Sequence, residues 1–217
     1  MRKVIASPFV TLDGFMAGPQ GEIDWNEPYF DEEMAGYVGE QFASVDTLLF
    51  GRGTYQLFVQ YWPTQGVKDD PVFAEKMNTL PKIVFSTTLE TVTWNNARLV
   101  KENVVEEIHS LKRQEGKHIV IDGSPGLIHS LTRLGLIDEY RLRVHPVVLG
   151  SGVPLFKDLK GRMPLQLIDS QTFHSGVVIL HYQPASRAVP EAFLLSFVLR
   201  DKKGETKWES LMERWRL

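Results

Sequence analysis

The sequence predicts an α/β fold with a mostly parallel sheet flanked by helices and antiparallel strands at its C-terminal end. Short apolar strands alternate with amphipathic helices up to about residue 136, an order typical of parallel sheets with helices on both faces. Three longer strand patterns then follow, the last two separated by a Ser175-Gly176 hairpin signal. The 217 residues suffice for one large domain, or for one domain with an extension.

The strands are identified by short apolar runs. Residues 118–121 are a clear buried run, whereas residues 97–100 are a weak one. In the run that begins at residue 138, Tyr140, Leu142 and Val144 alternate with polar residues, which is the period of a strand with one buried face. In chain order, the predicted strands cover residues 2–10, 45–50, 82–86, 97–100, 118–121, 138–149, 164–174 and 176–183.

The helices are identified by apolar spacing and by their end signals. Asp31 and Asn103 suit helix N-caps, and Pro125 suits a first helical turn. Residues 11–30 have no clear period, and a loop of this length inside a domain is usually functional. In chain order, the predicted helices cover about residues 31–44, 52–63, 70–80, 103–115 and 125–134.

Composition excludes several classes of function. The net charge of −3 and the pI near 6.1 give no reason to expect binding to nucleic acid or to a membrane surface. The chain has no cysteine, which excludes disulfides and thiolate catalysis and fits a cytoplasmic protein. No signal peptide or membrane span is recognisable. The six histidines form no pair with metal-ligand spacing, so no metal is expected.

The last 34 residues differ from the rest. Pro184 and Pro190 bracket a polar link, residues 192–199 are strongly apolar, and residues 206–217 carry apolar side chains at helical spacing. We therefore expect one domain over residues 1–183 and an extension over residues 184–217 that packs on the core or on a partner subunit. An alternative hypothesis makes this extension an interaction module and the core its scaffold.

Two strand-to-helix turns are candidate phosphate sites. In the first, Gly51 and Gly53 allow close backbone approach, Arg52 provides donors for phosphate, and Thr54 adds a hydroxyl. The second turn, Gly123-Ser124-Pro125-Gly126, also follows a buried strand. With Ser86 at the end of a third strand, the turns suggest a dinucleotide lying across strand ends. Ordinary turns with a solvated arginine remain the alternative.

The remaining candidates are an acidic residue, two tryptophans and a glycine loop. Asp13 is placed to bind a polar heterocycle, or to relay a proton if its pKa is raised; a turn-capping aspartate is the alternative. Trp25 and Trp62 suit the walls of a pocket for a ring-shaped ligand, although tryptophans more often pack in cores or at their boundaries. The loop with Gly150 and Gly152 either borders a cofactor or is a simple turn.

Taken together, these stretches resemble the reductase domain of bacterial riboflavin-biosynthesis deaminase-reductases (the RibD C-terminal domain family), which has a dihydrofolate-reductase-like fold. The resemblance covers about residues 2–183 and rests on an ordered set of motifs. These motifs are Thr11-Leu12-Asp13-Gly14-Phe15, Gly51-Arg52-Gly53-Thr54-Tyr55, Trp62-Pro63, Lys82-Ile83-Val84-Phe85-Ser86, Asp122-Gly123-Ser124, Leu134-Gly135-Leu136-Ile137-Asp138-Glu139 and the run 146–156.

The resemblance implies an NADPH-binding reductase that forms a homodimer and acts on a small pyrimidine or pterin-like heterocycle. By position, Arg52 and Thr54 would hold cofactor phosphates beside Gly51, and Ser86 would lie near the adenosine. Gly123 and Ser124 would meet the pyrophosphate, and Gly150 and Gly152 would border the nicotinamide. Asp13 would lie in the substrate pocket.

Two departures from the family pattern are visible. Asp122 occupies a position that is often glycine in relatives, and a carboxylate beside phosphates is unfavourable unless it points away. The chain has no cysteine to bind the zinc of a deaminase, so we expect no deaminase domain before the reductase. The charge of Asp122 supports a second hypothesis, a non-catalytic relative that binds a nucleotide or pterin and keeps the fold.

Overall fold

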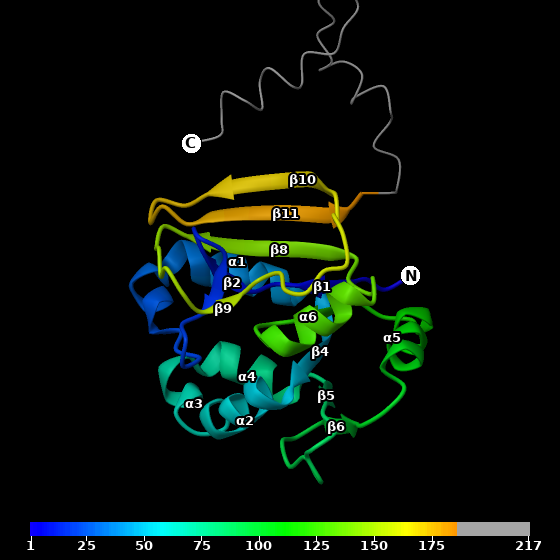
Figure 1. The fold of residues 1–217 in the computed structure, drawn as a ribbon. Helices are drawn as coiled ribbons and strands as arrows, with labels where there is room; N and C mark the ends of the chain where they lie inside the picture. The colour runs from blue at the N-terminus through cyan, green and yellow to red at the C-terminus, as the bar shows by residue number, and fades with distance from the viewer. Residues whose placement is uncertain (186–217) are drawn as a thin grey trace, which may run out of the picture.

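A computed structural model describes residues 1–185, which form a central sheet with helices on both faces (Figure 1). The strand order is β10-β11-β8-β1-β7-β4-β5-β6, and β2 also pairs with β8. The strands are β1 Val4–Ala6, β2 Phe9–Thr11, β3 Phe15–Ala17, β4 Val45–Gly51, β5 Lys82–Phe85, β6 Ala97–Val100, β7 His118–Ile121, β8 Glu139–His145, β9 Val153–Pro154, β10 Leu165–Thr172 and β11 Val178–Pro184. The helices are η1 Asp24–Tyr29, α1 Glu32–Ala43, α2 Arg52–Tyr61, α3 Gly66–Asp69, α4 Pro71–Thr79, α5 Val104–Arg113 and α6 Pro125–Arg133.

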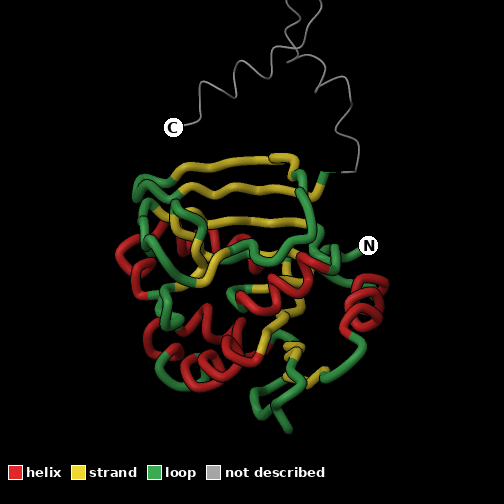
Figure 2. Tube along the Cα trace, viewed as in Figure 1, coloured by secondary structure: helices red, strands yellow, loops and turns green. Residues whose placement is uncertain are grey.

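The predicted fold class is confirmed. The strands β8, β1, β7, β4, β5 and β6 pair in parallel, and the antiparallel pairs β8–β11 and β11–β10 lie at one end of the sheet. Figure 2 shows β8, β11 and β10 running side by side at this end of the sheet. Because parallel strands all end at one edge, the carboxyl ends of β4, β5, β6 and β7 lie together.

Each face of the sheet carries its own apolar core. Leu49, Ile83 and Ile121 pack with residues of α5 and α6 on one face. Leu48, Phe50 and Val84 pack with residues of α1, α2 and α4 on the other. Buried strands covered on both faces need apolar side chains in both directions, which explains the continuous apolar runs that identified β4 and β7.

The N-terminal region is more structured than predicted. The strand expected over residues 2–10 is divided by Ser7 and Pro8 into β1 and β2, because proline has no N–H for a continuous ladder. The loop expected over residues 11–30 contains β3, which pairs with β9, and the 3-10 helix η1. Strands of two or three residues leave no periodic pattern in a sequence.

The helix ends were predicted with mixed success. Asp31 is an N-cap whose carboxylate accepts from the Met34 N–H at 2.9 Å. Asn103 is also an N-cap, but it has a left-handed backbone and its side chain makes no capping bond. The strand predicted to reach residue 149 ends at His145. All but the first two residues of the extension 184–217 lie outside the described residues, so its predicted packing stays untested.

Candidate active site

A cavity of about 410 Å³ opens where β4, β5, β6 and β7 end. It brings together five of the predicted cofactor residues, which come from three separate strand ends. These five are Gly51, Arg52, Thr54, Ser86 and Ser124. Ligands of open α/β sheets bind at this edge, so the cavity is where the sequence predicted a dinucleotide.

Two helices point their N-termini at this cavity. Neither α2 nor α6 has a side-chain capping bond, and Arg52, Gly53, Pro125 and Gly126 from their first turns line the wall. Free N–H groups and the helix dipole favour an anion at such a place. A Cβ built on Gly53 or Gly126 meets nothing within 4 Å, so the space over both turns is open.

The two turns are bonded to each other. The Ser124 N–H donates to Thr54 Oγ1 at 3.0 Å, and the Gly51 N–H donates to Ser124 Oγ at 3.1 Å. Gly123 has φ +73°, and Ser124 has φ +59°, which is uncommon for a residue with a side chain. Such strain tends to occur at ligand sites. The bonds hold both helix N-termini in a fixed relation before any ligand arrives.

Two cations and a hydroxyl-rich turn form the other side of the cavity. Arg52 donates to Thr88 Oγ1 at 3.0 Å, and Ser86 Oγ accepts from the Thr88 and Leu89 N–H groups. Lys101 also lines the cavity, and the sequence analysis missed it. Its position directly after β6 was the available signal, but that strand was the weakest of the predicted set.

Asp122 does not place an unbalanced charge beside the phosphate site. Arg143 Nη2 donates to Asp122 Oδ1 at 2.5 Å, and the guanidinium carbon of Arg143 lies 3.9 Å from the centre of the Phe9 ring. Arg143 is only 1% exposed. The ion pair holds the carboxylate of Asp122, and this removes the electrostatic objection raised by the sequence.

Asp13 joins two loops. Its carboxylate accepts from the Gly150 N–H at 2.7 Å, from the Leu149 N–H at 3.1 Å and from Thr11 Oγ1 at 2.6 Å. The Thr11 hydrogen bond, together with those from Gly150 and Leu149, lowers the pKa of Asp13. The raised pKa that a proton relay would require is therefore not found, and the geometry is that of a turn-capping aspartate. A role in substrate binding stays a prediction.

Gly152 is required by a close contact between backbones. Its φ is +153°, and a Cβ at this position would lie 2.2 Å from the Ala17 carbonyl oxygen. The contact lies at the pairing of β3 with β9. Neither Gly150 nor Gly152 lines the cavity at the helix N-termini, so their proximity to a nicotinamide stays a prediction.

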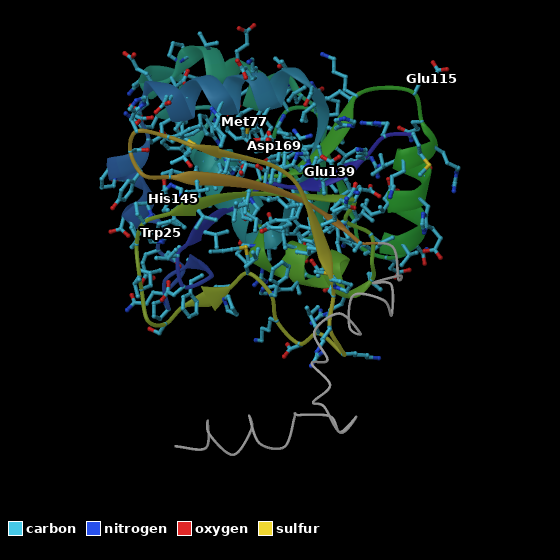
Figure 3. The ribbon with its side chains drawn as sticks, turned by 90° about the horizontal axis from the view of Figure 1, so that it is seen from above. Trp25, Met77, Glu115, Glu139, His145 and Asp169 are labelled. Atoms are coloured by element: carbon cyan, nitrogen blue, oxygen red, sulfur yellow. The ribbon has the colours of Figure 1, made fainter. Side chains whose placement is uncertain are left out.

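The two tryptophans lie apart. Trp25 lies close to His145 (Figure 3) and packs edge-on against it, with 5.3 Å between ring centres. Phe9 and Tyr29 contact the same imidazole edge-on. Burial lowers the pKa of His145 and so favours the neutral imidazole. Trp62 instead lies at the far end of α2 from the cavity and packs against Phe73 and its neighbours. The structure does not bring Trp25 and Trp62 together, and their substrate roles stay predictions.

Comparison with known sequences identifies the relatives of this chain. Residues 2–179 match the sequence model of the RibD C-terminal domain. The uncharacterized protein YyaP of Bacillus subtilis (strain 168) is 39% identical over 182 residues, which span 83% of this chain and 94% of YyaP.

Solved structures share the fold. A Shewanella sp. PV-4 protein named for riboflavin biosynthesis superposes with a TM-score of 0.67 and 25% identity, over 85% of this chain and 99% of its own. Dihydrofolate reductase from Enterococcus faecalis, solved with NADP(H), superposes with a TM-score of 0.55 and 14% identity, over 85% of this chain and 97% of its own. The second likeness shows the fold alone, which is dihydrofolate-reductase-like. Among residues 1–185, no helix is long and apolar enough to cross a membrane.

Proposed function

The chain belongs to the RibD C-terminal domain family, a reductase-like family linked to riboflavin biosynthesis, and from this premise we propose that it is an NADPH-dependent reductase of a pyrimidine or pterin-like heterocycle. The reaction would resemble that of 5-amino-6-(5-phosphoribosylamino)uracil reductase. The observation that carries the proposal is the cavity faced by the N-termini of α2 and α6 and lined by Arg52 and Lys101. Few ligands besides a polyphosphate match two helix N-termini and two cations in one cavity.

The residues of this cavity fit NADPH. The first turns of α2 and α6 would hold the pyrophosphate, and Arg52, Ser86 and Lys101 would hold the adenosine end with its 2′-phosphate. The cofactor supplies hydride chemistry when bound. The protein's own part is to fix both phosphate-binding turns through the Ser124 and Thr54 bonds and to orient the two reactants.

The test is a calorimetric titration of the purified chain with NADPH and, separately, with NADH. We expect tight binding of NADPH and weaker binding of NADH, because the 2′-phosphate adds a charge that faces Arg52 and Lys101. Absence of binding by either nucleotide would refute the proposal.

The charge of Asp122 had favoured the alternative hypothesis of a non-catalytic relative. Its pairing with Arg143 weakens that case, so catalysis is the better hypothesis. Turnover decides between the two: oxidation of NADPH in the presence of 5-amino-6-(5-phosphoribosylamino)uracil, followed at 340 nm, supports the enzyme. Nucleotide binding without oxidation, with this uracil and with dihydropterins, would support the binding protein.

The proposal includes a homodimer in the cytoplasm. Among residues 1–185, β10 pairs only with β11, and it is exposed along most of its length, with Leu167 and Ile168 each close to half exposed. A long edge strand that exposes apolar side chains is usually covered by another chain or segment. Sedimentation equilibrium tests the dimer, and a monomer at micromolar concentration would contradict it.

A further inference from the structure

The strands β3 and β9 form a small sheet apart from the main one. They have three and two residues, with Phe15 opposite Pro154 and Ala17 opposite Val153. A two-stranded pair is at best marginally stable in water by itself. The position of the β3–β9 pair therefore depends on its contacts with the rest of the protein.

His129, a half-buried residue of α6, makes one of these contacts. Its Nε2 lies 2.7 Å from the Pro154 carbonyl oxygen of β9. Because a carbonyl oxygen only accepts, Nε2 carries the hydrogen, which both the neutral Nε2–H tautomer and the imidazolium provide. Among residues 1–185, this is the one hydrogen bond between α6 and the β3–β9 pair.

Apolar packing brings the same two elements together. Leu155, directly after β9, is 5% exposed and belongs to the same core as Leu127, Ile128 and Leu131 of α6. Apolar burial has no preferred direction, whereas a hydrogen bond restricts both distance and angle. The core therefore keeps this segment near α6, and the hydrogen bond from His129 fixes the position of β9 along the helix.

The helix α6 is also part of the proposed cofactor cavity. Gly126, three residues before His129, and Ser130, the residue after it, both line the cavity. The turn before α6 is bonded to the turn before α2 through Ser124 and Thr54. A phosphate held at these helix N-termini would restrain α6, and with it the Nε2 donor that holds β9.

We propose that His129 is a positioning residue, which holds β9 and its partner β3 against the helix that binds the cofactor phosphates. The inference rests on the proposed function and adds a link between the phosphate cavity and the β3–β9 pair. In this role the imidazole acts through the Pro154 carbonyl and takes no part in the chemistry. Occupation of the cavity should therefore restrict the opening of β3 and β9.

Hydrogen exchange of the full chain, followed by mass spectrometry over residues 14–18 and 150–156, tests the contact without any nucleotide. The variant His129→Leu keeps an apolar side chain and removes the donor. We expect both segments to exchange about 3- to 10-fold faster than in the parent, the effect of one lost hydrogen bond on local opening. Equal exchange in the parent and in His129→Leu would overturn the inference.

A second variant separates the donor from the packing of the ring. His129→Gln replaces the Nε2–H of the imidazole with an amide N–H of similar reach, so it should restore slow exchange at least in part. His109→Leu, at an exposed position of α5, is the matched control and should exchange as the parent does. Equally fast exchange in both His129 variants would mean that the ring holds β9 by packing alone, and would overturn the inference.

The link to the cavity is tested by repeating the exchange with saturating NADPH. We expect NADPH to slow exchange of both segments about 5-fold in the parent and less than 2-fold in His129→Leu. NADPH affinity, measured by calorimetry on the same samples, should differ by less than about 3-fold between the two proteins, because the helix N-termini are intact in both.

The two ways of failing give different results. Absence of NADPH binding by the parent would refute the proposed function, and the link to the cavity with it. Tight binding without slower exchange of residues 14–18 and 150–156 would refute the link alone.

Discussion

Arg143 lies 21 residues beyond Asp122, and this distant partner determines what the carboxylate does. In the sequence alone, the negative charge of Asp122 suggests that it would repel a bound phosphate. Paired with a fully buried guanidinium, it instead becomes an anchor that holds the end of β7 against β8. The free energy of a charged residue depends on its neighbours in space more than on its own chemistry.

Replacement of Arg52 tests the cofactor site at a single residue. Arg52→Ala should weaken NADPH binding by about 1.5–3 kcal/mol if one charge-assisted hydrogen bond to phosphate is lost. Arg113→Ala, an exposed arginine on α5, serves as the control and should leave the dissociation constant unchanged. Calorimetry measures both. An unchanged constant for Arg52→Ala would remove this residue from the cofactor site.

Glu139 predicts a pH dependence of stability. Burial alone would raise the pKa of this carboxyl, but hydrogen bonds from Lys3 and Arg141 and the charges of Arg141 and His181 outweigh burial and lower the pKa to about 2. A lowered carboxyl pKa stabilises the folded state above the unfolded pKa near 4.5, and this contribution is lost as the pH falls from about 4.5 towards 2.

The variant Glu139→Gln should therefore be less stable than the parent by roughly 1–3 kcal/mol at pH 7. The difference should shrink at pH 3, where the parent has lost part of this contribution. Urea unfolding at pH 7, 4 and 3 provides the measurement. A difference that stays constant over this range would mean that the charge of Glu139 does not stabilise the fold.

At the scale of elements, the site depends on turns that hold each other in place. The turn before α2 and the turn before α6 share two hydrogen bonds through Ser124 and Thr54, so neither helix N-terminus is positioned by its own strand alone. The pair β3–β9 also depends on a contact between distant segments, because the backbone at Gly152 lies directly against the Ala17 carbonyl.

The contact at Gly152 predicts a local loss of stability. Gly152→Ala places a Cβ 2.2 Å from the Ala17 carbonyl oxygen at a φ of +153°, so the backbone has to shift. We expect a cost of about 1–3 kcal/mol, measured by urea unfolding. Gly161→Ala, whose Cβ meets nothing within 4 Å, is the control. Equal stability of the two variants would show that β3 and β9 separate easily.

At the scale of the whole molecule, cofactor binding should stabilise the fold. A ligand present at 100 times its dissociation constant stabilises the folded state by about 2.7 kcal/mol if the unfolded chain does not bind it. For a chain of this size, that corresponds to a rise in Tm of roughly 5–10 °C. Differential scanning fluorimetry with NADPH and with NADH checks this, and equal shifts would argue against recognition of the 2′-phosphate by Arg52 and Lys101.

The sequence by itself determined the fold class and most of the phosphate-binding cavity. Buried parallel strands require continuous apolar runs, and turns such as Gly51-Arg52-Gly53 and Gly123-Ser124 require residues that tolerate unusual backbone angles. Both requirements are local, so they are visible along the chain. The carboxyl ends of parallel strands lie at one edge of the sheet. The two turns could therefore be expected to lie close together before the strand order was known.

Only the tertiary structure decided which side chains pair. Contacts between distant segments decide which groups Asp122 and Asp13 bind. They also place Lys101 in the cavity and keep Trp25 apart from Trp62. Hydrogen bonds and ion pairs act over a few ångströms in space, and the order of residues along a chain does not fix those distances.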